Sequence, residues 1–370
     1  MRELSPRRLA AGASEYHERM RRTGISLALS GGGFRATLFH AGALLRLNEL
    51  GLLSRLTRIV SVSGGSIAAG FLASRWSNLA WSRGIATNLR NEIVDPLKDF
   101  CSATIDVPAV VGAALHPAKS ACDLLKSVYK KRLFGNAQLK EMPKNPTFVI
   151  QATHLSTGRA FRFYRDHMAD YLIGSAPTDG ISIATAVTAS SAFPPILSPL
   201  LLPVGANRFR RLPGAHLHDR PEYRETLVLS DGGVYDNLGL EQAWKTETVL
   251  VSDAGAPFDF DPSANEWLRP LAIATDQSRG LRKRWLIDQY VRGVRKGAYW
   301  GIETNIAHYP TASIAVDRDA QLRLARLRTR LNAFSNHEQS QLINLGYGLS
   351  DAACRSHLGL DATFALPEQE

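Results

Sequence analysis

The sequence predicts an α/β protein built on a parallel β-sheet, and two observations near the N-terminus carry that prediction. A short apolar run at 24–30, GISLALS, is followed by three glycines and a helical pattern at 34–51. The same order then repeats, with a strand pattern at 57–63, a Ser-Gly-Gly turn and a helical pattern at 64–76. Strands that alternate with glycine turns and helices are typical of parallel sheets covered by helices.

Further strand and helix patterns follow along the chain. The segments that contain strands are 146–165, which turns at Gly158, 225–244, which continues into a helix, and 247–255. The basic segments with a helical pattern are 278–301 and 322–334. The stretch from about 80 to 145 is irregular, and we treat it as a candidate lid over a pocket.

The chain shows no repeat, low-complexity tract or linker, so we expect a single domain with an elaborated periphery. The expected parts are an N-terminal helical lead-in at 1–23, a core at 24–260 and a helical C-terminal extension at 261–370. The extension is expected to pack on the core.

Composition places few limits on function. The 370 residues are 45% hydrophobic, which is enough for a sizeable core, and 44 Lys and Arg outnumber 34 acidic residues. That excess favours an anionic surface, such as a membrane, nucleic acid or an acidic ligand, although many basic proteins bind none of these. Three distant cysteines, no signal-peptide pattern and no run of 18 apolar residues indicate a cytoplasmic protein without a membrane span.

Ser63, in the turn SVSGGS, stands where a nucleophile would be expected. A sharp strand-to-helix turn lifts a serine hydroxyl off the sheet, and small neighbours such as Gly64 let a substrate carbonyl approach. The usual pattern is G-x-S-x-G, and Ser61 replaces its first glycine, so the match is partial. Taken alone, such a turn is more often structural.

The glycine loop of SGGGFRA, Gly31, Gly32 and Gly33, suggests an anion site at a helix N-terminus. Its amides could hold the oxyanion of an acyl-transfer transition state or a phosphate group; a tight turn without chemistry is the third reading. The phosphate-loop pattern fails because no Lys-Ser or Lys-Thr follows, and the dinucleotide pattern fails at Ala36. Arg35 adds a positive charge beside the loop.

Asp231 ends an apolar strand in LSDGGVYDN and is the first candidate for the base that accepts the serine proton. Burial in a dry pocket would raise its pKa toward a useful value. Asp253 in LVSDAG has the same local context and competes with it. A Ser-His-Asp triad is the other alternative; its candidate histidines are His154, His216, His218 and His308.

In these motifs the sequence resembles the patatin-like phospholipases, including the cytosolic phospholipase relatives that share the Ser-Gly-Gly-Gly-x-Arg loop. The matching blocks occur in order over about 25 to 255. They are SGGGFRA (30–36), SVSGGS (61–66), ATHLSTG (152–158), TASSAFPPIL (188–197) and DGGVYDNLG (231–239). The ordered set is more specific than any single block, and the residues beyond about 260 lie outside it.

The resemblance implies a three-layer α/β/α sandwich with a mostly parallel central sheet and a Ser-Asp dyad. Ser63 matches the nucleophile, Asp231 the base and Gly31 to Gly33 the oxyanion loop. Arg35 matches a basic residue that can meet the substrate phosphate in phospholipase relatives, and Gly64 adjoins the nucleophile on the substrate side. Ala36, where patatins have glycine, agrees with the cytosolic phospholipase version.

The implied function is hydrolysis of a lipid ester, by a phospholipase, lysophospholipase or esterase, without a metal or other cofactor. A catalytically silent lipid-binding or regulatory protein with the same fold is the alternative, and a nucleotide-binding protein is disfavoured by the missing Lys-Ser or Lys-Thr. We expect no nucleic acid partner. Transient contact with an anionic membrane is an expectation carried by two basic clusters. They are Lys126, Lys130, Lys131 and Arg132, and Arg282, Lys283 and Arg284.

Overall fold

The structure is a computed structural model that describes residues 22–105, 120–258, 260, 269–312, 316–360 and 366–368. Most of the expected N-terminal lead-in, residues 1–21, therefore lies outside the described residues, as does 106–119 of the candidate lid. Arg22 and Thr23, which were expected to precede the first strand, already belong to it.

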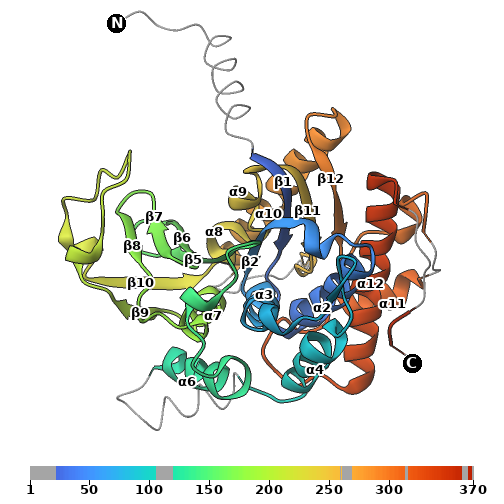
Figure 1. The fold of residues 1–370 in the computed structure, drawn as a ribbon, viewed down its shortest axis with the longest axis horizontal. Helices are drawn as coiled ribbons and strands as arrows, with labels where there is room; N and C mark the ends of the chain where they lie inside the picture. Colours follow the sequence, from blue (N-terminus) through green and yellow to red (C-terminus); the bar gives the residue numbers. More distant parts are fainter. Residues whose placement is uncertain are drawn as a thin grey trace, which may run out of the picture.

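One mixed sheet of ten strands runs through the described part of the chain, in the order β12-β11-β1-β2-β5-β6-β7-β8, with β10 beside β5 and β9 beside β10. Its strands are β1 (Arg22–Leu29), β2 (Leu56–Val62), β5 (Thr147–His154), β6 (Arg159–Phe163), β7 (His167–Asp170), β8 (Gly174–Pro177), β9 (Leu200–Pro203), β10 (Thr226–Asp231), β11 (Thr246–Asp253) and β12 (Lys296–Gly301). A two-stranded hairpin of β3 (Trp81–Ser82) and β4 (Ile85–Ala86) stands apart. The pairings from β12 to β5 are parallel, and the pairings of β5 with β6 and β10 and of the strands that follow them are antiparallel. The antiparallel strands lie to the left in Figure 1.

Helices cover both faces of the parallel strands, which confirms the three-layer α/β/α arrangement (Figure 1). One face carries α2 (Gly33–Glu49), α3 (Gly64–Arg75), α4 (Asp95–Cys101), α6 (Ala121–Tyr129), α7 (Ile183–Ser191) and α12 (Asn336–Leu358). The other carries α8 (Gly233–Asp236), α9 (Leu240–Ala243) and α10 (Arg269–Val291). Helix α11 (Arg318–Ala325) contacts α12.

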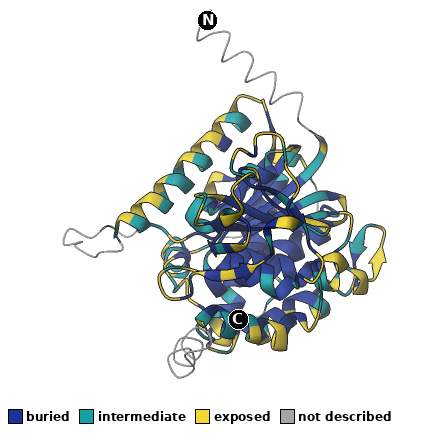
Figure 2. Cartoon of the chain, turned by 90° about the vertical axis from the view of Figure 1, so that its left-hand side faces the viewer, coloured by how far each residue is buried: buried dark blue, intermediate teal, exposed yellow. Residues whose placement is uncertain are grey.

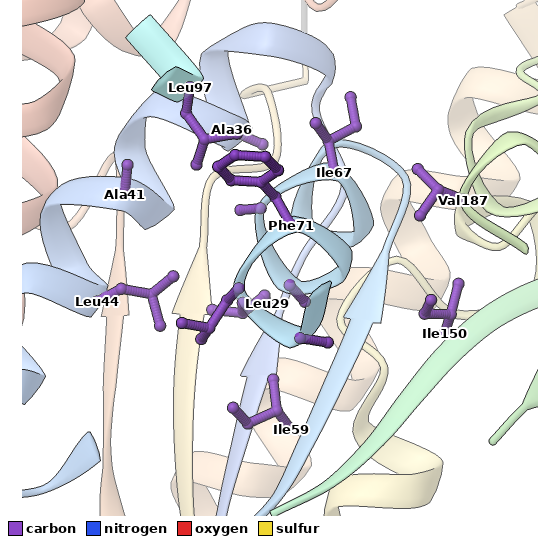
Figure 3. Packing of buried hydrophobic residues seen from close by; sticks show 14 of the residues in the cluster. Leu29, Ala36, Ala41, Leu44, Ile59, Ile67, Phe71, Leu97, Ile150 and Val187 are labelled. Atoms are coloured by element: carbon purple, nitrogen blue, oxygen red, sulfur yellow. The ribbon is translucent and has the colours of Figure 1, made fainter. Parts of the chain in front are cut away.

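Alternation along the strands builds two separate cores. Leu27 and Leu29 of β1 face α2 and α3, whereas Ala28 between them faces the opposite layer. Successive side chains of a strand point to opposite faces, so a continuous apolar run such as ISLAL serves both cores at once. In Figure 3, Leu29 and Ile59 from the sheet lie beneath Phe71 of α3.

Two expected helices end earlier in the structure than the sequence pattern indicated. Residues 278–301 were expected to be helical throughout, but α10 ends at Val291 and 296–301 form β12, parallel to β11. Residues 322–334 were also expected to be helical, but α11 ends at Ala325. The following segment bonds to distant backbone instead: Phe334 N–H donates to Cys101 O and Leu331 O accepts from Ile105 N–H. Tertiary hydrogen bonds outweigh local helix propensity at both places.

Helices α2 and α12 approach each other closely through two glycines. A β-carbon added to Gly42 would lie 1.9 Å from Ile343 O, and one added to Gly346 would lie 1.9 Å from Phe39 O. Neither contact partner is a flexible side chain, because both are backbone oxygens. The C-terminal helix therefore packs on the first helix of the core, and any side chain at the crossing would force the two apart.

Helix α10 has a mainly exposed outer side. Leu281, Trp285 and Val291 are 60%, 66% and 82% exposed, and Leu286 is the buried residue of this helix. In Figure 2 it is the long helix at the upper left, with exposed and half-buried residues along its length. Among the residues that the structure describes, no helix has both the length and the apolar character needed to cross a membrane.

Replacing Gly346 by Ala should lower the free energy of unfolding by about 1–3 kcal/mol, because overpacking at a tight contact has this cost. Gly280→Ala is the matched control: it lies in α10, where an added β-carbon meets nothing nearer than Arg284 Nη1 at 3.5 Å. That change should stabilise by up to about 1 kcal/mol, since alanine is the better helix former. Urea unfolding of both variants measures this, and equal effects would contradict the proposed close packing.

Candidate active site

Strand β5 brings the two candidate catalytic residues together. Along the same strand, Val62 of β2 pairs in parallel with Gln151, and Asp231 of β10 pairs antiparallel with Ala152. Strands β2 and β10 thus run toward each other and end at neighbouring positions of β5. Ser63, the residue after Val62, and Asp231 therefore lie at one point of the sheet although 168 positions separate them in sequence.

Ser63 occupies a strained turn between β2 and α3. Its φ of 50° and ψ of −119° place a residue with a side chain in the left-handed half of the backbone map, which is costly and characteristic of functional turns. Its carbonyl oxygen accepts hydrogen bonds from Ser66 N–H and Ile67 N–H, and its own N–H donates to Ser190 Oγ at 3.0 Å. The residue is 9% exposed, so little of it faces solvent.

Asp231 is buried, and one of its two carboxylate oxygens has a normal hydrogen-bond partner among the described residues. Its Oδ1 accepts the Gly233 N–H at 2.7 Å, whereas Oδ2 has no partner of normal hydrogen-bond geometry among the described residues. Burial raises the pKa of Asp231 to about 6, and the Ser63 side chain and the Gly233 amide partly offset that rise. The Ser63 hydroxyl therefore interacts with the carboxylate without being fully aligned to it, as is common for catalytic pairs in the absence of substrate.

Asp253, the competing candidate base, has the opposite electrostatics. Burial opposes its ionisation, but Arg279, the Gly255 N–H and the Tyr299 hydroxyl together hold its pKa below the ordinary value. Tyr299 donates to Oδ2 at 2.8 Å and Gly255 to Oδ1 at 2.9 Å, so both oxygens are occupied. A carboxylate with a lowered pKa and no free oxygen is a poor proton acceptor, which favours Asp231.

The glycine loop lies directly beside Ser63, at the N-terminus of α2. Gly32 and Gly33 have φ values of 143° and 58°, which glycine adopts without strain. A β-carbon added to Gly64 would lie 2.9 Å from Gly33 N, so the N-termini of α2 and α3 converge. Two helix N-termini that meet at a serine form a site suited to a developing negative charge.

The three loop amides are not equivalent. Gly31 N–H donates to Asn237 O at 3.1 Å, whereas no acceptor for the amides of Gly32 and Gly33 is found in the described part of the chain. A β-carbon added to Gly31 would lie 2.3 Å from Asn237 Oδ1. The Asn237 side chain, three residues beyond the DGGV turn, thus fills the space that a larger residue at Gly31 would need.

A C-terminal segment covers the same loop. A β-carbon added to Gly33 would lie 1.8 Å from Thr329 O, and Phe34 N–H donates to Arg330 O at 3.4 Å. Both contacts come from the segment that was expected to be helical. The glycine loop is therefore covered by backbone from the C-terminal part of the chain.

Arg35, expected from the family resemblance to meet a substrate phosphate, is engaged by backbone carbonyl groups in this structure. The side chain is fully buried, and its guanidinium donates to Ala325 O, Leu327 O and Ala254 O at 2.7–2.8 Å. Burial and the nearby Arg279 lower the pKa of Arg35 to about 10. A structural role fits better, because the guanidinium ties the end of α11 and the end of β11 to the glycine loop.

The histidines weighed as alternative bases take other roles. His154 Nδ1 lies 3.0 Å from Asp170 Oδ2, and His218 Nδ1 lies 2.8 Å from Ile173 O. Within the described ranges, no histidine is hydrogen-bonded to Ser63 or Asp231. Nor does that part of the chain contain a group of three or more His, Cys, Asp or Glu residues that could hold a metal ion.

A family model described as patatin-like phospholipase matches residues 27–244, more than half of the chain. The chain belongs to the patatin-like phospholipase family. Ser63, Asp231 and the glycine loop all lie within the matched region. The covering segment at 326–334, α10 and α12 lie outside it. No curated protein matches the sequence.

Several solved structures are similar to this chain. Human GIVD cytosolic phospholipase A2 in complex with methyl gamma-linolenyl fluorophosphonate and terbium chloride is 13% identical, with a TM-score of 0.51 over 92% of this chain and 60% of that one. A second structure of the human GIVD enzyme is 11% identical, with a TM-score of 0.52 over 95% and 64% of the two chains. VipD from Legionella pneumophila is 15% identical, with a TM-score of 0.38 over 91% and 67%. The chain thus spans about 60% of the length of the human structures, which show the fold that it shares.

Sequence reasoning missed two residues that shape the site, Asn237 and Ser190. Asn237 stands inside the DGGVYDN motif, but its role depends on the approach of Gly31 from 206 positions earlier in the sequence. Ser190 stands in the TASSAFPP block, where nothing distinguishes it from Ser191 in the sequence. Only the fold shows which of the two serines faces the turn at Ser63.

The two aspartates should respond oppositely to neutralisation. Because the pKa of Asp231 is raised from 3.8 to about 6, ionisation destabilises the folded state as pH rises through that interval. Asp231→Asn should therefore gain stability relative to wild type between pH 4.5 and pH 7.5, by about 2 kcal/mol, because part of the interval between the two pKa values lies below pH 4.5. Asp253→Asn should be less stable than wild type at both pH values. The lowered pKa of Asp253 stabilises the folded state at every pH above the pKa that this carboxyl has in the unfolded chain, and the stabilisation is lost only in stronger acid.

Urea unfolding of wild type and both variants at pH 4.5 and pH 7.5 measures the difference. If Asp231 is the candidate base, the difference in free energy of unfolding between Asp231→Asn and wild type changes with pH. The same difference for Asp253→Asn stays nearly constant. The reverse pattern would move the candidate base to Asp253.

Proposed function

We propose that this protein is a serine-dependent lipid acyl hydrolase, of the phospholipase, lysophospholipase or esterase type, that uses Ser63 and Asp231. The observation that carries the proposal is the pairing of a strained, almost buried serine with a buried carboxylate of raised pKa and one unpartnered oxygen. Membership of the patatin-like phospholipase family supports a lipid ester as substrate.

The proposed reaction needs no group beyond the described side chains, the substrate and water. Ser63 Oγ bonds to the ester carbonyl carbon while its proton passes to Asp231 Oδ2. The tetrahedral intermediate expels the alcohol, which takes the proton from Asp231. Water then bonds to the acyl carbon while its proton passes to Asp231. The bond to Ser63 Oγ breaks, Asp231 returns the proton to that oxygen, and the fatty acid is released.

The amides of Gly32, Gly33 and Gly64 are the proposed donors to the oxyanion. They lie at the N-termini of α2 and α3, where helix dipoles favour negative charge, whereas Gly31 N–H is engaged by Asn237 O. We expect Gly31 to act by its small size, since it admits Asn237 beside the turn. The sequence led us to expect an oxyanion role for all three loop glycines, and we now propose it for Gly32 and Gly33 but not for Gly31.

A catalytically silent lipid-binding or regulatory protein is the second candidate, and one observation favours it. The backbone of Thr329 and Arg330 lies against Gly33 and Phe34, at the edge of the proposed oxyanion site. A substrate would have to displace or pass this segment. The reactivity of Ser63 distinguishes the two candidates. It is high in an enzyme in which the segment at 329–330 moves aside, and it is low in a protein in which this segment keeps the site closed.

An alkyl fluorophosphonate should form a single adduct on wild type, at Ser63, and none on Ser63→Ala. Asp231→Ala should be labelled about 10²–10⁴ times more slowly, the usual contribution of a general base. Intact mass against time measures both, and peptide mapping locates the adduct. Asp253→Ala is the control, expected to be labelled far faster than Asp231→Ala.

Slow labelling of Asp253→Ala together with normal labelling of Asp231→Ala would contradict the base assignment. Absence of an adduct on folded wild type would favour the silent binding protein.

Contact with a lipid surface is the second part of the proposal. Phe193 and Ile196 are 56% and 55% exposed and lie in the loop after Ala192, whose carbonyl oxygen accepts the Asp231 N–H. Helix α6 lies beside this loop, because Cys122 Sγ donates to Leu197 O. The helix leads to Lys130 and Lys131, which are exposed and have no acidic partner in the described part of the chain. Exposed apolar side chains in the loop after Ala192 and exposed lysines after α6 thus lie on segments that contact each other, and a protein that docks on anionic lipid uses side chains of both kinds.

The other basic cluster is less suited to docking than its sequence suggested. Arg282 Nε lies 3.4 Å from the buried Asp236, and Lys283 Nζ lies over the Tyr299 ring at 4.8 Å. Both charges are thus engaged by the protein itself. The lysines next to α6 are the better candidates for contact with lipid.

Wild type should float with phosphatidylcholine vesicles that contain phosphatidylserine, and less so at high salt. Phe193→Asp should weaken this binding at least about tenfold, because burying an exposed aromatic side chain is worth about 1.5–3 kcal/mol. Val294→Asp, which alters an exposed valine between α10 and β12, is the control and should bind like wild type. Negligible flotation of wild type in both salts would refute the docking surface.

A further inference from the structure

The last turn of α7 contacts both members of the proposed dyad. Ser190 Oγ accepts the Ser63 N–H at 3.0 Å. From the same turn, Ala192 O accepts the Asp231 N–H at 2.9 Å and Ser190 O accepts the Gly232 N–H at 3.1 Å. Three hydrogen bonds from one rigid turn therefore fix the nucleophile and the base relative to each other.

The hydroxyl of Ser190 hydrogen-bonds to β5 and to the turn at Ser63 rather than to the backbone of its own helix. Its neighbours Thr188 and Ser191 donate to carbonyl oxygens one turn back, Ala184 O and Val187 O, as hydroxyls in a helix commonly do. Ser190 Oγ donates instead to Gln151 O on β5, at 2.6 Å. Its oxygen also lies 2.9 Å from Ser66 Oγ, so the one hydroxyl joins β5, the turn at Ser63 and α3.

The network includes the residue that departs from the usual nucleophile-turn pattern. Ser66 Oγ donates to Ser61 Oγ at 3.0 Å, and Ser61 stands where that pattern has glycine. Ser61, Ser66 and Ser190 have 1%, 0% and 0% of their surface exposed, so no solvent can replace a lost partner. Ser61, which replaces the first glycine of the pattern, thus belongs to the hydrogen-bond network that supports the turn at Ser63.

We propose that Ser190 is a positioning residue that holds Ser63 in its strained conformation and in register with Asp231, an inference that rests on the proposed hydrolase function. The Ser63 conformation is one that a residue with a side chain keeps only when its surroundings impose it. Its N–H has Ser190 Oγ as the partner that holds it. Loss of that partner lets the turn relax and moves the Ser63 hydroxyl away from Asp231.

The test is the rate of fluorophosphonate labelling as a function of pH, for full-length wild type, Ser190→Ala and the control Ser191→Ala. Ser190→Ala should be labelled about 10–100 times more slowly, since a displacement of about 1 Å can cost a hundredfold. Its pH profile should also move to higher pH, because the Ser63 side chain lowers the pKa of Asp231 in wild type. Ser191→Ala, which removes a buried hydroxyl bonded to Tyr129, should match wild type in rate and profile.

Circular dichroism establishes that each variant is folded, and Ser190→Cys replaces Ser190→Ala if the latter unfolds. The thiol keeps a polar group at this position, although it is larger than the hydroxyl, and it accepts hydrogen bonds weakly, so the same alkaline shift is expected. Wild-type rate and profile in Ser190→Ala would overturn the proposal, as would equal slowing in Ser191→Ala. If wild type itself gives no adduct, both this proposal and the hydrolase function fall.

Discussion

The candidate site depends on the way strand β5 is shared. Its first half pairs in parallel with β2 and its second half pairs antiparallel with β10, so the two partner strands end against each other at Gln151 and Ala152. Backbone hydrogen bonds set this junction, and a shift of one residue in either register would turn the terminal side chains to the other face. The position of Ser63 relative to Asp231 thus follows first from strand pairing, and α7 then fixes it from the side.

Close packing and strain occur together at this junction. Gly232 contacts Gln151 O, Gly64 contacts Gly33 and Gly31 contacts Asn237, each at a distance that a β-carbon would not allow. Such density excludes water, and exclusion of water is what raises the pKa of Asp231. The same packing leaves Ser63 little exposed surface, so the arrangement that raises the pKa of Asp231 also restricts access to Ser63.

The part of the chain beyond the family match is integrated with the site rather than appended to it. Strand β12 extends the main sheet, α12 packs against α2, and Thr329 and Arg330 lie on the glycine loop. Arg279 of α10 holds Asp253 as a carboxylate and so separates its behaviour from that of Asp231. The boundary expected near 260, where the matching motifs end, therefore falls within one continuous sheet, because β12 lies beyond it.

The sequence by itself determined the local features of this protein. The alternation of strands, glycine turns and helices, the turn at Ser63 and the strand end at Asp231 each depend on residues within a few positions of one another. The α/β class predicted from them is confirmed, as is the three-layer arrangement that the family resemblance implied. The tertiary structure decided what depends on contacts between distant residues. It made β12 a strand because β11 offers a partner. It also drew 326–334 out of helical form, because Cys101 O and Ile105 N–H, far away in the sequence, offer hydrogen bonds to this segment. It also gave Asp231 and Asp253 opposite pKa shifts, because the charges and hydrogen-bond donors around a carboxylate are set by the packing of distant segments rather than by its neighbours in sequence.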